Sequence, residues 1–223
     1  MKSIAILALC LPTLLAGQEQ FTKYTAIRCG RLFDARSGQT LEHATILVAG
    51  NTIRSVGTSV LVPSDAEIVD LSDATVLPGL IDCHTHVLLQ GDITAQDYEA
   101  QLLREPIPYR TIRGAVAAQA ALRNGFTTIR DLGSEGAMYA DVDIKRAIAN
   151  GIIEGPRMVV ATRALDVTGA YPLLGYSWEL RLPKGVQVAD GVDECRRAVR
   201  EEVENGADLI KVYADRSYYI TDD

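Results

Sequence analysis

Histidine, cysteine and positive charge are all scarce in this sequence. It contains three histidines and four cysteines, and its 22 lysine and arginine residues are outnumbered by 29 aspartate and glutamate residues, giving a net charge of −7. A chain this acidic offers no basic surface for a phosphate backbone, so we expect no nucleic-acid partner. The contents of 48% hydrophobic and 23% charged residues are those of an ordinary globular protein, which argues against disorder.

The first 17 residues have the anatomy of a secretory signal. Lys2 supplies a positive charge, a short apolar core follows, and the chain turns small and polar at residues 16–18. The apolar core is too short for a typical membrane-spanning helix, and Pro12 argues against the alternative of a buried strand. We expect residues 1–17 to be a signal peptide, the protein to be exported to the periplasm or secreted, and no membrane association to remain after signal removal.

The cysteines predict neither a disulfide framework nor a metal site. Removal of the leader would leave Cys29, Cys83 and Cys195, an odd number without the spacing of metal ligands. Cys83 is expected to pack between a central sheet and its helices.

Two of the three histidines lie two residues apart, at the end of a run that is typical of a buried strand. Side chains alternate along a strand, so Asp82, His84 and His86 share one face while Cys83 lies on the other. Neutral imidazoles bind zinc and similar divalent metals, and two of them leave positions for carboxylates, water and substrate. The alternative is a strand that carries two histidines for packing or solubility.

Strands and helices alternate after residue 78. Strands are predicted over residues 80–86, 126–131, 157–161 and 209–213, and helices over residues 111–124, 141–150 and 192–205. Four strands separated by three helices are typical of a parallel α/β array.

Residues 18–78 differ, since they contain short β-rich runs separated by turn residues and predict the N-terminal part of a β-sandwich domain. The predicted fold class is therefore α/β: the first half of a (β/α)8 TIM-type barrel over residues 79–223, preceded by a small β-sandwich segment. A whole barrel takes roughly 250 residues, so we expect this chain to be an N-terminal fragment.

Residues 78–86 resemble the first barrel strand of the metal-dependent amidohydrolase superfamily, and residues 206–213 resemble its fourth. The likeness is closest to the secreted branch that contains imidazolonepropionase-like and Xaa-Pro dipeptidase-like enzymes. The resemblance implies that His84 and His86 bind one metal and that Lys211, carboxylated by carbon dioxide, bridges two divalent metals. Zinc is the expected metal, with its identity left open.

The resemblance also implies amide hydrolysis by a metal-bridging hydroxide, with Lys211 in the catalytic centre. Strand alternation turns Lys211 inward, where a buried ammonium is costly and a neutral amine can form a carbamate. The alternative is an ordinary lysine that reaches the surface. The family takes two further histidines and an aspartate from later strands, which this sequence lacks, so the segment alone is expected to be inactive.

Other residues are candidates for supporting roles. Tyr213 shares the face of Lys211 and either lines the pocket or packs in the core. Arg163 or Arg181 could hold a substrate carboxylate. Asp131 ends a predicted strand and is expected to cap or support a loop rather than to contact the metal ligands from behind. The connection over residues 166–191 is long enough to be a substrate lid.

These features predict a hydrolase of carbon–nitrogen bonds in small substrates such as dipeptides or N-acyl amino acids. A cyclic-amide hydrolase or a deaminase of small heterocycles is the enzymatic alternative, and a non-catalytic scaffold protein is the other. The expected partners are a small-molecule or dipeptide substrate and, as an open option, a second copy of the chain.

Overall fold

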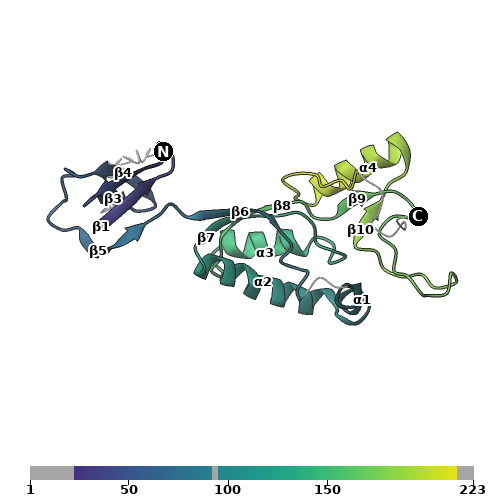
Figure 1. Cartoon of the computed structure of the whole chain (residues 1–223). Coiled ribbons are helices and arrows are strands. Elements are labelled where there is room, and N and C mark those ends of the chain that lie inside the picture. The colour runs from purple at the N-terminus through teal and green to yellow at the C-terminus, as the bar shows by residue number, and fades with distance from the viewer. Residues whose placement is uncertain (1–22, 92–94, 215–223) are drawn as a thin grey trace, which may run out of the picture. The chain divides into compact units, whose positions relative to one another are not determined.

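The computed structural model describes residues 23–91 and 95–214, except for the side chains of residues 95 and 96. The predicted signal peptide lies outside these residues. The chain divides into two compact units, Met1–Pro78 and Gly79–Asp223, at the residue where the sequence pattern changes (Figure 1). None of the described helices is long and apolar enough to cross a membrane.

The first unit is a single five-stranded sheet. Its strands are β1 (Tyr24–Asp34), β2 (Gln39–Glu42), β3 (Thr45–Ala49), β4 (Thr52–Gly57) and β5 (Glu67–Val76). β1 pairs antiparallel with β2 and β3 and parallel with β5, and β3 and β4 form the hairpin that Gly50 and Asn51 predict. Gly30 marks a register shift between β1 and β5, where a Cβ would lie only 2.3 Å from Ser72 O. The described residues of this unit thus form one sheet, and the sandwich to which it would contribute stays a prediction.

The second unit alternates strands and helices. Its elements are β6 (Leu80–Thr85), α1 (Ala95–Arg104), α2 (Ile107–Arg123), β7 (Phe126–Asp131), α3 (Ala140–Ala149), β8 (Arg157–Val160), β9 (Ala164–Asp166), β10 (Val186–Val188) and α4 (Gly191–Glu204). β6, β7 and β8 form a parallel sheet in chain order, and β9 pairs parallel with β10. This is the mixed α/β order that the sequence predicts, whereas α1, β9 and β10 were not foreseen.

The predicted fourth strand, residues 209–213, is reduced to one parallel bridge between Leu165 and Val212. Leu165 donates to Lys211 O at 2.8 Å and accepts from Tyr213 N at 3.0 Å. The strand is short because the third strand is interrupted at Thr162, whose φ is 62°, and only the three residues of β9 continue beyond it. The strand prediction was therefore too long, although its position beside the third strand was right.

Helices α2 and α3 cover one face of the β6–β7–β8 sheet (Figure 1). Their contact buries Ala118 and Ile144 against Ile129 and Met158. At roughly 25 cal/mol per Å², fully burying one large aliphatic side chain contributes about 1.5–3 kcal/mol, so this cluster stabilises the packing of the two helices on the sheet. Cys83 is exposed, which corrects the expectation that it is buried, because α2 packs toward β7 and leaves the outer face of β6 uncovered.

The helical spacing of Cys195, Val199 and Val203 predicts one buried face for α4. The observed buried face is rotated toward Ala198 and Glu202, and of the three predicted residues Val199 packs against the core. Val203, on the predicted face, is exposed, while Ala198 and Glu202 are buried. Glu202 is buried because it hydrogen-bonds to Thr162 and Arg163 at the interruption of the third strand. A buried polar network therefore decides the rotation of α4 about its axis.

Substitution of Gly79 by Ala should lower the free energy of unfolding by about 1–2 kcal/mol. A Cβ on Gly79 would lie 2.7 Å from Thr127 Cβ, which cannot rotate away, and overpacking of this kind costs about 1–3 kcal/mol. Urea unfolding measures the change. Gly57→Ala is the control, since the nearest atom to its Cβ is 4.0 Å away. Equal stabilities of the two variants would contradict the close approach of β6 and β7.

Candidate metal centre

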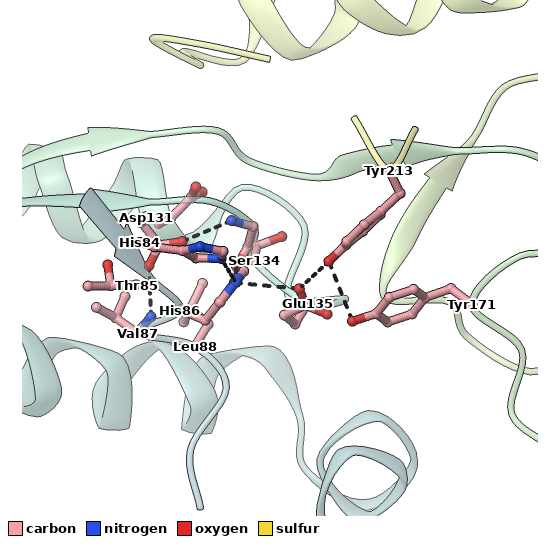
Figure 2. Close-up of polar contacts among 12 residues, drawn as sticks. His84, Thr85, His86, Val87, Leu88, Asp131, Ser134, Glu135, Tyr171 and Tyr213 are labelled. Atoms are coloured by element: carbon pink, nitrogen blue, oxygen red, sulfur yellow. Dashed lines mark hydrogen bonds and ion pairs between the residues drawn. The ribbon is translucent and has the colours of Figure 1, made fainter. Parts of the chain in front are cut away.

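His84, in β6, and His86, just after it, converge at the C-terminal end of the strand. His84 Nε2 and His86 Nε2 are 3.3 Å apart, and the ring centroids are separated by 5.3 Å (Figure 2). Both imidazoles face the same side, as strand alternation predicts. His86 Nδ1 lies 3.0 Å from Gly133 O, an acceptor that places the proton on Nδ1 and leaves the Nε2 lone pair toward His84.

The surroundings keep both imidazoles neutral. Burial lowers the pKa of His84 and His86 below the ordinary value, and the positive charge of Lys211 lowers the pKa of each further. The Gly133 carbonyl opposes the change at His86. A neutral imidazole is the form that binds a metal, so the pair is ready to act as ligands near neutral pH.

Lys211 lies close enough to this pair for its charge to act on both histidines. Its Nζ is 5.0 Å from the ring centroid of Tyr213, so the two side chains share one face as predicted. Tyr213 stacks on Tyr171 from the long connection, with centroids 5.1 Å apart (Figure 2). The structure therefore brings His84, His86, Lys211 and Tyr213 together.

The two arginines considered for substrate binding lie elsewhere. Arg163 Nη2 is 2.6 Å from Glu201 Oε1, 2.9 Å from Glu202 Oε1 and 2.7 Å from Tyr139 OH. These contacts assign its guanidinium to the junction between β8, α3 and α4. Arg181 is exposed in the connection that precedes β10.

Asp131 supports the end of β6 from the neighbouring strand. Its carboxylate is fully buried and accepts from Val87 N at 2.7 Å and from Gly133 N at 3.2 Å (Figure 2). Burial raises the pKa of Asp131 to about 8, and the two N–H donors oppose the rise. Asp131 thus has the loop-supporting position that its place at a strand end indicates.

Two buried charges at the centre were not anticipated. Arg110 of α2 is 1% exposed and donates to Leu88 O at 2.8 Å and to Glu135 O at 2.8 Å. Glu135 is 2% exposed, and its Oε1 lies 3.5 Å from His86 Nδ1. Burial raises the pKa of Glu135 to about 7. The place of Glu135 in a short loop after a predicted strand, with Gly133 and Gly136 near it, was a signal for this residue, whereas nothing in the sequence marked Arg110.

The donors present here fit part of a divalent metal site. Two imidazole nitrogens and a carboxylated Lys211 would supply two nitrogen ligands and one or two oxygens, a set that suits zinc and similar ions. Within the described residues, no group of three or more histidine, cysteine, aspartate and glutamate side chains is placed to hold a metal by itself. A complete site would therefore require Lys211 and further ligands.

The sequence and the fold of this chain are both similar to those of known proteins. Residues 75–221 match the model of the amidohydrolase family. Ochratoxinase of Aspergillus niger is 30% identical over 231 residues, which covers 95% of this chain and 46% of the relative. The crystal structure of ochratoxinase aligns with a TM-score of 0.70 at 28% identity, over 91% of this chain and 49% of that one.

Two further proteins are similar to the chain. A prolidase crystallised with N-methylphosphonate-L-proline has a TM-score of 0.74 at 31% identity, over 87% of this chain and 47% of the prolidase chain. Imidazolonepropionase of Vibrio cholerae is 36% identical over 74 residues, which covers 33% of this chain and 18% of that relative.

These matches confirm the resemblance and the partial-barrel fold that the sequence predicts. The protein has the α/β scaffold of a class of hydrolases that generally use divalent metals. This chain belongs to the amidohydrolase family. It spans about half the length of the full-length relatives that it matches.

Replacement of Arg110 by Met should lower the free energy of unfolding by roughly 3 kcal/mol. The change leaves the buried carbonyls of Leu88 and Glu135 without donors, and each unpaired group costs about 1–3 kcal/mol. Chemical denaturation measures the loss. Arg123→Met, at an exposed position of the same helix, is the matched control and should stay within about 0.5 kcal/mol of wild type. A loss below about 1 kcal/mol at position 110 would show that other contacts hold the loops.

Proposed function

We propose that the whole protein is a metal-dependent hydrolase of amide bonds in small substrates such as dipeptides or N-acyl amino acids. The observation that carries the proposal is the convergence of His84 Nε2 and His86 Nε2 at 3.3 Å, beside Lys211. Such a pair of neutral nitrogens has little structural value by itself, because each side chain could be better solvated apart. Membership of the amidohydrolase family supports the same conclusion.

His84, His86 and Lys211 would each have a separate role at the metal centre. His84 and His86 bind one of two divalent ions, expected to be zinc, and Gly133 O holds the proton on the far nitrogen of His86. Lys211 loses a proton, and its neutral Nζ forms a bond to the carbon of carbon dioxide and releases a second proton, which gives an anionic ligand for both ions. When bound, the metals polarise the scissile carbonyl and supply hydroxide near neutral pH.

The substrate class rests on the relatives. A prolidase with 31% identity binds a ligand that contains L-proline, which supports a substrate with an amino-acid portion. Tyr213 would line the pocket beside Lys211, and Tyr171 would contribute from the long connection that we propose as a lid. The Arg163 guanidinium already binds two glutamates, so Arg181 is the remaining candidate to hold a substrate carboxylate.

A second candidate function is hydrolysis of a cyclic amide or deamination of a small heterocycle. The 74-residue match to imidazolonepropionase favours it. A non-catalytic scaffold is the third candidate. We also propose that the protein is exported to the periplasm or secreted. Its proposed partner is a small-molecule substrate, and pairing with a second copy of the chain is left open. Hydrolysis of dipeptides by the purified whole protein separates the first candidate from the second, and bound metal separates both from the third.

Replacement of either His84 or His86 by Ala in the whole protein should remove at least one equivalent of bound metal and abolish measurable hydrolysis. Each substitution removes one of the two nitrogen ligands of the ion, so the remaining histidine must hold the ion without it. Elemental analysis of the purified variants measures the metal. His43→Ala is the matched control, because His43 is the remaining histidine and is exposed in the first unit. Full metal content in the His84 and His86 variants would rule out the proposed centre.

Lys211 should carry the mass of one carbon dioxide in the metal-loaded whole protein under native ionisation. Substitution of Lys211 by Ala should remove this mass and lower metal content, because the bridging anion is lost. Lys184→Ala, at an exposed lysine, should change neither. An unmodified Lys211 in a metal-loaded, active protein would refute the bridging role and leave the histidine ligands standing.

A further inference from the structure

Glu135 is a buried charged residue that the proposed chemistry does not use. Its side chain is 2% exposed, and its Oε2 has no hydrogen-bond partner among the described residues. Its backbone is also strained, since φ is 49°, a region that costs a non-glycine residue about 1–3 kcal/mol. A residue that is unfavourable in both respects persists only where its surroundings impose it.

The surroundings of Glu135 are tightly packed. Arg110 donates to its carbonyl oxygen at 2.8 Å. A Cβ on Gly133 would lie 3.3 Å from Glu135 Oε1, and one on Gly185 would lie 3.2 Å from Glu135 Oε2 and 1.7 Å from Tyr98 OH. The two glycines therefore leave just enough space for the carboxylate, and the buried guanidinium holds the backbone of Glu135.

The carboxylate lies between the two groups of proposed metal ligands. Glu135 Oε1 is 3.5 Å from His86 Nδ1 and accepts from Tyr213 OH at 3.3 Å (Figure 2). Tyr213 follows Lys211 by two residues on the same face. In the part of the chain that the structure describes, this is the hydrogen bond that joins a side chain of residues 208–213 to the loop behind His86.

The backbone contacts of residues 208–213 do not by themselves fix the distance between Lys211 and the histidines. Leu165 holds this segment through a single bridge, Ile210 packs against the Leu165 cluster, and Asp208 holds the start of the segment through Lys145 and the backbone of Val160, away from the histidines. A single bridge fixes the position of a strand much less firmly than a full ladder. The separation between Lys211 and the histidines thus depends on side-chain contacts.

We infer that Glu135 is a positioning residue, which bridges His86 and Tyr213 and thereby sets the separation between the histidine pair and Lys211. The inference rests on the proposed metal centre and adds a residue that touches neither metal nor substrate. Tyr171, stacked on Tyr213, holds the phenol ring in the plane that this bridge requires.

The test compares Glu135→Gln and Tyr213→Phe in the metal-free whole protein. Each should weaken zinc binding by about 10- to 100-fold in competition with a chelating dye, as loss of a contact behind a ligand typically does. Tyr213→Phe removes the hydroxyl donor, whereas Glu135→Gln keeps an amide oxygen that can accept and removes the negative charge, so the double variant should bind zinc about as weakly as Tyr213→Phe alone. Each should also change the visible absorption of bound cobalt, which reports ligand geometry without requiring turnover.

The surface pair Glu99 and Tyr176 provides the matched control, since it is also a glutamate that accepts from a tyrosine hydroxyl but is exposed. Glu99→Gln and Tyr176→Phe should leave zinc affinity and the cobalt spectrum unchanged. Thermal unfolding of the metal-free proteins separates positioning from packing. Glu135→Gln should unfold at the same temperature as wild type or a few degrees higher, because a neutral amide replaces a buried carboxylate.

The outcomes distinguish this inference from the proposed function. Wild-type protein that binds no zinc overturns both. Wild type that binds zinc, with Glu135→Gln and Tyr213→Phe within twofold of it, overturns the positioning role alone, as does a lowered unfolding temperature with an unaltered cobalt spectrum. If Glu135→Gln fails to fold, Tyr213→Phe decides by the same zinc and cobalt measurements, since it removes one hydroxyl from a half-buried ring.

Discussion

A single buried guanidinium holds together the part of the molecule on which the candidate metal centre depends. Arg110 reaches from α2 to the carbonyl of Leu88, two residues after the histidine pair, and to the carbonyl of Glu135, after β7. Arginine suits this place because its planar fork presents several donors at fixed angles and stays charged. Asp131 completes the arrangement from below by accepting from Val87 N and Gly133 N. Arg110 therefore pairs with a backbone carbonyl in each of the two loops, and Asp131 pairs with a backbone N–H in each.

This arrangement explains why unfavourable features collect at one point. The loop after β7 contains a left-handed Glu135, a buried Asp131 and a glycine that only fits without a side chain. Each feature costs free energy alone. Together they place the Gly133 carbonyl and the Glu135 carboxylate beside His86, and the carbonyls of Leu88 and Glu135 beside the Arg110 guanidinium, whose charge-assisted hydrogen bonds offset part of the cost. The core beneath, formed by α2 and α3, keeps the loop from relaxing.

The sequence predicted those parts that depend on local periodicity. Alternation along a strand was enough to place His84 and His86 on one face, and helical spacing located α2, α3 and α4. Prediction from local patterns failed where contacts between charged residues distant in the sequence determine the structure. The apolar residues of α4 suggested one buried face, but Glu202 is drawn inward by Thr162 and Arg163, which no local pattern announces. The shortened fourth strand has the same origin, because it follows from the interruption of the third.

The site combines a firmly held half with a lightly held one. His86 directly follows β6, a strand within a packed sheet, and its ring is fixed by Gly133 O. Lys211 belongs to a segment attached by one bridge to Leu165 of β9 and by one backbone hydrogen bond, from Asp208 N, to Val160 of β8, and segments with few backbone bonds open locally at low free energy. A metal bound by both halves would draw on the rigidity of the first to order the second. The free energy of metal binding would then be reduced by the conformational entropy that Lys211 loses on binding. The hydrogen bond from Tyr213 to Glu135 orders this segment beforehand, so it affects metal affinity without contributing a ligand.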